Sequence, residues 1–147
     1  MLLSSHTAIG MYRLALLLPL VLCGVGCGRD NPFELVKVSG TLTYDDGTLI
    51  PANLIILKFE PLAVALDTKT HPPSGMSYVN VTDGTFDVVT SYKYADGLVS
   101  GQHRVLVSAT ASGAPTTLIP GEYIDSDRTP LLVDTADSPF RLVVRKP

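Results

Sequence analysis

Residues 102–109 read Gln-His-Arg-Val-Leu-Val-Ser-Ala, with side chains of different character alternating along the chain. Successive side chains of a β-strand point to opposite faces, so a period of two separates two faces. One face of this stretch carries His103, Val105, Val107 and Ala109. The other face carries Arg104, Leu106 and Ser108. The alternation predicts a half-buried strand.

The same period recurs before and after this stretch. Residues 53–60 place Ile55, Leu57 and Phe59 on one face. Leu54 and Ile56 make the opposite face apolar as well, so this strand is expected to lie centrally or to be covered on both sides. Further strands are expected at residues 36–43, 78–81, 85–90, 131–134 and 140–144.

Turn residues separate these strands. Asp46-Gly47 and Asp83-Gly84 are typical of tight turns, because glycine adopts positive φ without strain. Residues 78–81 and 85–90 are expected to pair across the second of these turns, with Phe86 and Val88 pointing inward. Because no convincing helical pattern accompanies the seven strands, the chain is predicted to be all-β. We expect a single antiparallel seven-stranded Ig-like β-sandwich over residues 35–147.

Length and composition limit the classes of protein. The 147 residues suit one domain and a processed leader, and 46% hydrophobic residues are enough to form a core. A multidomain enzyme and a disordered chain are excluded. The net charge of −3 comes without a basic cluster, so nucleic acid is not an expected partner.

The amino-terminal residues are typical of an export signal. An uncharged run begins after Arg13 and is too short to span a bilayer, since Pro19 interrupts it and Gly24 and Gly26 follow. Residues 1–26 are therefore predicted to be a lipoprotein signal peptide, with Met11 as an alternative start. Residues 27–34 are expected to form a short tether.

Small residues immediately before Cys27 resemble a bacterial lipobox, which predicts a lipid on Cys27. The alternatives are an ordinary secretory signal cut near the same point, or a buried pair with Cys23. A lipidated Cys27 holds the protein at a membrane without crossing it. We therefore expect an exported protein of the bacterial cell envelope. Gly28 in place of an aspartate slightly favours the outer membrane over the inner membrane.

The order of the turn motifs resembles that of the carboxypeptidase-regulatory-like, transthyretin-like sandwich domains of small bacterial lipoproteins. Four stretches carry the resemblance, and they are residues 38–51, 83–86, 96–107 and 119–131. All four are structural motifs rich in Gly, Pro and Asp. The resemblance therefore implies a fold and an envelope location, and it implies no specific activity.

The residues of the mature chain suggest no catalytic constellation. His71 and His103 lack further ligands at metal-binding spacing, and His103 is expected to be a strand-end residue satisfied by hydrogen bonds. The acidic residues lack the pattern of a calcium loop, and Asp125-Ser126-Asp127 is at best a fragment of such a site. We predict no cofactor, no metal and no enzymatic activity.

Aromatic residues in predicted loops and strand ends are the candidate binding residues. They are Tyr78, Tyr92, Tyr94 and Tyr123. The leading hypothesis is a non-enzymatic module that contacts an envelope protein or a glycan, or that is purely structural. The alternative is a small-ligand-binding or hydrolytic transthyretin-like domain. Neither the partner nor the oligomeric state follows from these residues.

Overall fold

The computed structural model describes residues 31–113 and 117–147, so the predicted signal peptide and Cys27 lie outside the described residues. The described chain is all-β, and its only helical elements are two short 3-10 turns, η1 (Gly121–Ile124) and η2 (Thr135–Asp137). No helix among the described residues has the length and apolar character needed to cross a bilayer.

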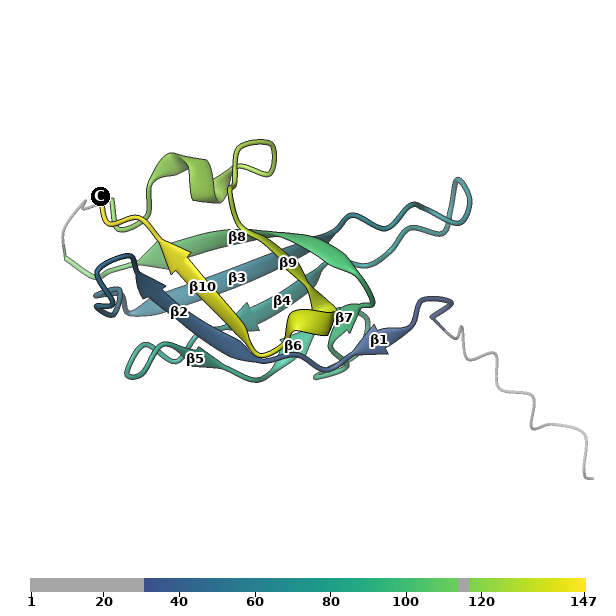
Figure 1. The fold of residues 1–147 in the computed structure, drawn as a ribbon, viewed down its shortest axis with the longest axis horizontal. Helices are drawn as coiled ribbons and strands as arrows, with labels where there is room; N and C mark the ends of the chain where they lie inside the picture. Colours follow the sequence, from purple (N-terminus) through teal and green to yellow (C-terminus); the bar gives the residue numbers. More distant parts are fainter. Residues whose placement is uncertain (1–30, 114–116) are drawn as a thin grey trace, which may run out of the picture. The chain divides into compact units, whose positions relative to one another are not determined.

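Ten strands form three sheets in this part of the chain (Figure 1). The five-stranded sheet has the order β6-β4-β3-β8-β9 and contains β3 (Leu54–Pro61), β4 (Gly75–Tyr78), β6 (Val89–Thr90), β8 (Gln102–Thr110) and β9 (Leu132–Asp134). The three-stranded sheet has the order β10-β2-β5 and contains β2 (Gly40–Tyr44), β5 (Thr85–Phe86) and β10 (Phe140–Val144). A short ladder joins β1 (Leu35–Val36) to β7 (Leu98–Val99).

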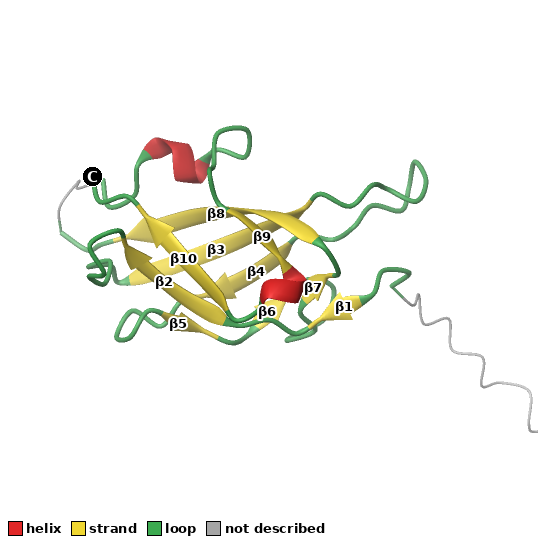
Figure 2. Ribbon diagram, viewed as in Figure 1, coloured by secondary structure: helices red, strands yellow, loops and turns green. Residues whose placement is uncertain are grey.

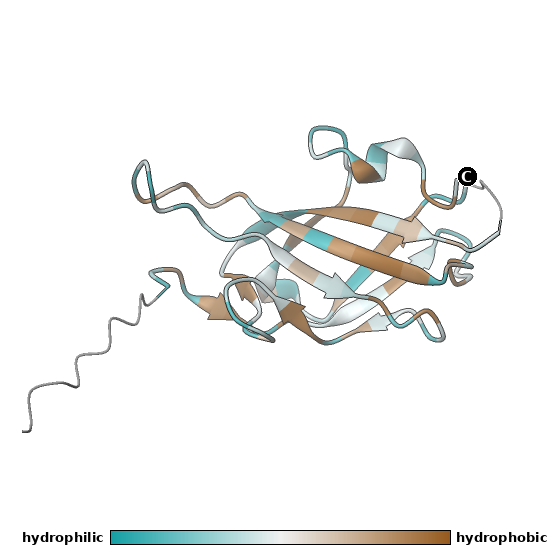
Figure 3. Cartoon of the chain, turned by 180° about the vertical axis from the view of Figure 1, so that it is seen from behind, coloured by the Kyte–Doolittle hydropathy of each residue, from teal (hydrophilic) through white to brown (hydrophobic). Residues whose placement is uncertain are grey.

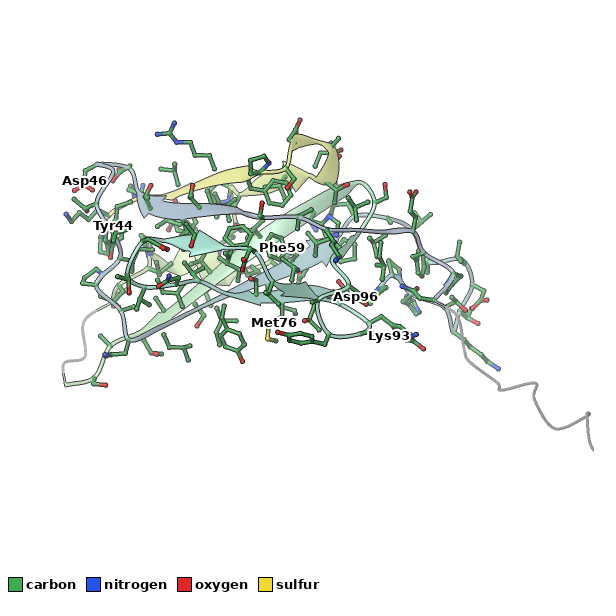
Figure 4. All side chains as sticks on the ribbon, turned by 90° about the horizontal axis from the view of Figure 1, so that it is seen from below. Tyr44, Asp46, Phe59, Met76, Lys93 and Asp96 are labelled. Carbon is green, nitrogen blue, oxygen red and sulfur yellow. The ribbon has the colours of Figure 1, made fainter. Side chains whose placement is uncertain are left out.

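The two larger sheets face each other across one apolar core (Figure 1). Phe59 of β3 lies at its centre, with its ring centroid 6.0 Å from that of Phe86 and 6.2 Å from that of Phe140. Phe86 and Phe140 belong to the opposite sheet, so three aromatic rings join the two layers. Figure 4 shows Phe59 between the sheets.

The alternation read from the sequence is confirmed in β3 and β8. Ile55, Leu57 and Phe59 are buried, as are Val105 and Val107. Along both strands the intervening residues are less buried. β3 lies at the centre of its sheet, between β4 and β8, but its second face is not covered.

Two expectations about the arrangement of the strands need correction. The described residues hold ten strands instead of seven. Two expected strands are each divided in two, residues 36–43 into β1 and β2 and residues 85–90 into β5 and β6, and β7 was not expected. β10 pairs with β2 in parallel, so the sheets are not purely antiparallel. β2 and β10 lie far apart in sequence, and such parallel pairs require a long connection instead of a tight turn.

The expected hairpin over residues 78–90 is divided between two sheets. β5 pairs with β2, whereas β6 pairs with β4. The chain therefore crosses from one layer to the other between Phe86 and Val89. Both of these residues are buried, whereas Val88 is 39% exposed and does not point inward as expected. The crossing shifts the inward and outward alternation by one residue.

Candidate functional site

The outer face of the five-stranded sheet carries an unusual number of apolar side chains. We define the apolar face by Leu54, Ile56, Met76, Tyr78 and Leu106. The exposed fractions of Leu54, Met76 and Tyr78 are 42%, 46% and 63%. Figure 3 views the molecule from the side of this sheet, and Figure 4 shows Met76 pointing away from the core.

Strand register brings these side chains together. Ile56 of β3 pairs with Tyr78 of β4, so these two side chains are cross-strand neighbours. Lys58, two residues further along β3, pairs with Met76 on one side and with Leu106 on the other. The apolar face therefore spans β4, β3 and β8, and Lys58 lies between two of its members.

Lys58 and Glu60, both on the outer side of β3, form an ion pair. The Lys58 ammonium lies 2.7 Å from a Glu60 carboxylate oxygen. The second oxygen of Glu60 accepts a hydrogen bond from the Ser126 hydroxyl. The hydrogen bonds from Lys58 and Ser126 lower the pKa of Glu60, so the carboxylate stays ionised and paired.

The outer face of the three-stranded sheet is different in character. A shallow groove of about 850 Å³ runs over it, and we call it the polar groove. Its floor includes the threonines Thr41, Thr43 and Thr85. Asp87 and Arg141 also line it, and neither forms an ion pair with another described residue.

One wall of the polar groove is a rigid turn. The Asp83 carboxylate accepts hydrogen bonds from the Thr85 hydroxyl and the Thr85 backbone N–H, at 2.6 and 2.9 Å. These bonds lower the pKa of Asp83. The Asn80 amide donates to the other carboxylate oxygen at 3.1 Å. Asp83 is thus committed to holding the turn, whereas Asp87 and Arg141 remain available to a ligand.

The four tyrosines predicted as contact residues lie in three different environments. Tyr78 belongs to the apolar face and also lines the polar groove. Tyr92 and Tyr94 lie in the loop between β6 and β7 and are 47% and 84% exposed. Only Tyr78 is therefore placed beside both candidate surfaces.

The expectation that Tyr123 lies at the surface is wrong. It lies in η1 and is only 6% exposed. Its ring packs with the core, and its hydroxyl oxygen accepts a hydrogen bond from the Arg145 backbone N–H at 3.0 Å. Pro120 and Gly121 carried a turn signal, but period-two reasoning has no means of detecting a turn that folds back onto the core.

His103 is fully buried near the start of β8, on the inner face of that strand. Its Nδ1 lies 3.1 Å from the Gly101 carbonyl oxygen, whereas its Nε2 has no hydrogen-bond partner among the described residues. The expectation of a histidine satisfied by hydrogen bonds is therefore correct for one nitrogen only. Burial lowers the pKa of His103, which keeps the imidazole neutral.

Two of the acidic side chains near predicted turns are occupied by local contacts. Asp125 accepts from the Arg128 guanidinium at 2.7 Å and from the Asp127 backbone N–H at 2.9 Å. Asp46 pairs with the Lys146 ammonium at 2.7 Å. Within residues 31–113 and 117–147, no group of three His, Cys, Asp or Glu side chains is arranged to hold a metal ion.

Family models, curated proteins and solved structures offer no match to this chain. The resemblance to transthyretin-like domains therefore rests on the turn motifs alone. Assignment of a function depends on the two outer faces and on the sequence of the leader.

Sequence reasoning missed most of the apolar face. Tyr78 was identified as a contact residue, but Ile56, Met76 and Leu106 were not. The available signal was the strand at residues 53–60, whose two faces are both apolar. It permitted burial on both sides, and only the sheet order shows that the second face lies open.

Proposed function

We propose that this protein is exported, anchored by a lipid on Cys27 in the bacterial cell envelope, and acts there by binding a protein partner without catalysis. The contact surface is the apolar face centred on Met76 and Tyr78. Its scaffold is an Ig-like sandwich of the transthyretin-like type.

The exposure of the apolar face is the observation that carries this proposal. The solvent side of an antiparallel sheet normally carries polar residues. Here Met76 is 46% exposed and Tyr78 is 63% exposed, and both are outward members of β4. Tyrosine and methionine are enriched at protein interfaces, and contiguous exposed apolar patches commonly mark interaction sites.

The anchor is supported by the order of features in the leader. Arg13, an uncharged run and small residues precede Cys27 in the pattern of a lipoprotein signal. Cleavage before Cys27 removes Cys23, so the only remaining thiol is the one that receives the lipid.

Site-specific photocrosslinking in cells tests the contact surface. A photoreactive phenylalanine analogue replaces Met76 in the full chain expressed with its own leader. We expect one predominant protein adduct in the membrane fraction, because Met76 lies inside the contact surface. Mass spectrometry of the same fraction should show acylated Cys27 in the amino-terminal peptide.

Two further variants serve as the matched control. Tyr78→Ser, introduced beside the photoreactive residue, removes a neighbouring contact and should abolish the adduct. Thr41→Ser lies on the polar face of the other sheet and should leave the adduct intact. An adduct that persists in the Tyr78→Ser chain, or no predominant adduct at all, would overturn the assignment of this surface.

The polar groove supports a second candidate, which is a glycan ligand. Arg141 and Asp87 face the groove unpaired, and Tyr78 at its edge offers a ring on which a sugar can stack. A thermal-shift screen of envelope oligosaccharides tests this candidate. A stabilising oligosaccharide whose effect is lost in Arg141→Ala and retained in Lys58→Ala would favour it over the protein partner.

A further inference from the structure

Three segments that are distant in sequence lie together at one end of the described chain. The Glu34 carbonyl accepts a hydrogen bond from the Ser100 N–H at 2.9 Å, and the Gln102 carbonyl accepts one from the Leu62 N–H at 2.8 Å. Residues 100–102 thus contact both the start of the described chain and the start of the loop of residues 62–74. In Figures 1 and 2 this loop projects beyond the sheets on the side where β1 lies.

The loop of residues 91–97 belongs to the same end. β6 runs antiparallel to β4, so its last residue, Thr90, lies opposite Met76, just after the 62–74 loop ends. A side chain at Gly97 would collide with the Val36 carbonyl, which places this loop directly against β1. We call this region, formed by residues 31–34, 62–74 and 91–97, the entry end.

The entry end exposes apolar side chains on an ordered loop. Val64 and Leu66 are 82% and 60% exposed. The loop is held by the Leu66 N–H, which donates to the Thr70 carbonyl at 2.9 Å, and by Asp67. The Asp67 carboxylate accepts from the N–H groups of Lys69 and Thr70, both at 2.7 Å.

The second loop has the same construction. Tyr94 is 84% exposed. The Asp96 carboxylate accepts hydrogen bonds from the backbone N–H groups of Ser91, Tyr92 and Lys93 and so fixes the loop. The Lys93 ammonium lies 5.7 Å from the centroid of the Tyr92 ring. In Figure 4, Lys93 and Asp96 lie toward the end of the molecule opposite Tyr44 and Asp46.

We infer that the entry end rests on the lipid surface, with Val64, Leu66 and Tyr94 inserted among the headgroups and the upper acyl chains. This inference rests on the proposed lipid at Cys27. Cys27 precedes Asn31 by four residues, and a fully extended chain of this length reaches only about 14 Å. A lipid on Cys27 therefore brings this end of the domain close to the membrane.

The chemistry of the exposed side chains suits this surface. Tyrosine is enriched at membrane interfaces, where its ring is apolar and its hydroxyl is hydrated. Aliphatic side chains at loop tips gain from transfer out of water. The acidic groups of the two loops, Asp67 and Asp96, are turned inward to backbone N–H groups. Lys69 and Lys93 are exposed, so their ammonium groups can pair with lipid phosphates.

Lipid contact also separates the tyrosines by role. Tyr92 and Tyr94 face the membrane, whereas Tyr78 lies on the side of the domain and is free for a partner. β3 runs from Leu54 at the far end to Pro61 at the entry end, a span of about 23 Å for its eight residues. The apolar face therefore stands beside the membrane and is not covered by it.

The absence of tryptophan from the sequence makes the inference directly testable. The full chain carrying Val64→Trp, extracted from membranes, is reconstituted in vesicles of phosphatidylethanolamine and phosphatidylglycerol with brominated acyl chains. We expect most of the tryptophan emission to be quenched and its maximum to shift to shorter wavelength. The matched control is Leu54→Trp, an exposed position at the far end of β3, whose emission should not change.

Tyr94→Trp provides a second reporter from the other loop, so the inference does not depend on one variant. Vesicle flotation and the mass of the amino-terminal peptide are measured on the same samples. An acylated protein that floats with vesicles, but whose tryptophans at 64 and 94 are no more quenched than the one at 54, overturns the inference and leaves the anchor standing. An unmodified Cys27 in a chain that stays off the vesicles overturns both.

Discussion

The outer faces of the two sheets are built by the same alternation and carry opposite chemistry. Around the polar groove, the three-stranded sheet turns Thr41, Thr85 and Arg141 outward. On the apolar face, the five-stranded sheet turns out Ile56, Met76 and Leu106. Both sheets bury their inner faces against the same core. The apolar side chains of the second face therefore lie outside this core.

This difference separates positions that are constrained by packing from positions that are free to contact other molecules. Inward positions are constrained by packing, so they report on the fold alone. Outward positions are free to be polar, as Thr41, Thr43 and Thr85 on the three-stranded sheet show. The apolar side chains that remain exposed on the other sheet are the observation on which the proposed contact surface rests.

The largest effect is expected where both sheets meet. Phe59→Ala removes the ring that lies between Phe86 and Phe140 and leaves a cavity in the core. A buried Phe to Ala change costs about 3–5 kcal/mol of unfolding free energy. Urea denaturation measures it, with Tyr78→Ala as the control on the exposed face, which should change stability by about 0.5 kcal/mol or less. An equal cost at the two positions would contradict the separation of inner and outer faces.

A smaller loss is expected from a change confined to the sheet beneath the polar groove. A Cβ at Gly40 would lie 2.5 Å from the Phe140 carbonyl oxygen and 2.8 Å from a ring carbon of Phe86. Gly40→Ala should therefore push β10 and β5 away from β2, at a cost of about 1–3 kcal/mol for overpacking. Amide hydrogen exchange should show faster exchange in β2 and β10, whereas β3 and β8 keep their protection. Uniform loss of protection in both sheets would contradict this prediction.

The buried imidazole predicts a pH dependence on the inner face of the five-stranded sheet. Burial lowers the pKa of His103 below 6.5, against smaller raising effects from the Gly101 carbonyl and the Asp134 charge. The unfolded chain then binds a proton that the folded chain does not, so stability falls as the pH drops from 6.5 through the lowered pKa. Above pH 6.5 this contribution is fully present.

Thermal unfolding between pH 7.5 and pH 5 measures this effect. His103→Leu should flatten the dependence on pH, because the titrating group is gone. His71→Gln removes an exposed histidine from the 62–74 loop and should leave the dependence as it is. If the two substitutions alter the slope equally, the buried histidine is not its source.

The smallest change in stability, and the sharpest contrast between the two faces, is expected at Lys58. This lysine is the charged residue between Met76 and Leu106 on the apolar face. Its exposed pair with Glu60 is expected to contribute little to stability, because water and salt screen such pairs. Lys58→Met should therefore leave the unfolding free energy nearly unchanged but promote self-association, as measured by sedimentation velocity. Thr43→Met in the polar groove should remain monodisperse under the same conditions.

Local pattern accounts for much of the fold. The period of two at residues 53–60 and 102–109 correctly predicted two strands that face the core with Phe59, Val105 and Val107. Asp83-Gly84 correctly predicted a tight turn, since Gly84 has a φ of 76° and a Cβ there would meet the Leu42 carbonyl oxygen at 2.6 Å. These features depend on neighbouring residues only, so a single sequence contains them.

The proposed contact surface was only partly predictable. Tyr78 was correctly expected to be exposed at a strand end, but Tyr123 was wrongly grouped with it, because burial of an irregular segment depends on what packs over it. The apolar positions Ile56 and Leu106 were visible as strand residues. Whether an outward face meets water or another sheet depends on the arrangement of all ten strands.

By itself, the sequence determined the β class, the phases of the strands at residues 53–60 and 102–109, and the turn at Asp83-Gly84, because strand period and turn chemistry are local properties of the backbone. It also contained the leader pattern on which the proposed anchor rests. Only the tertiary structure decided that β5 and β6 join different sheets and that β2 pairs with β10. Tertiary structure also left one apolar face uncovered and gathered two exposed loops beside the start of the described chain. These outcomes depend on contacts between residues distant in sequence, which strand period does not encode.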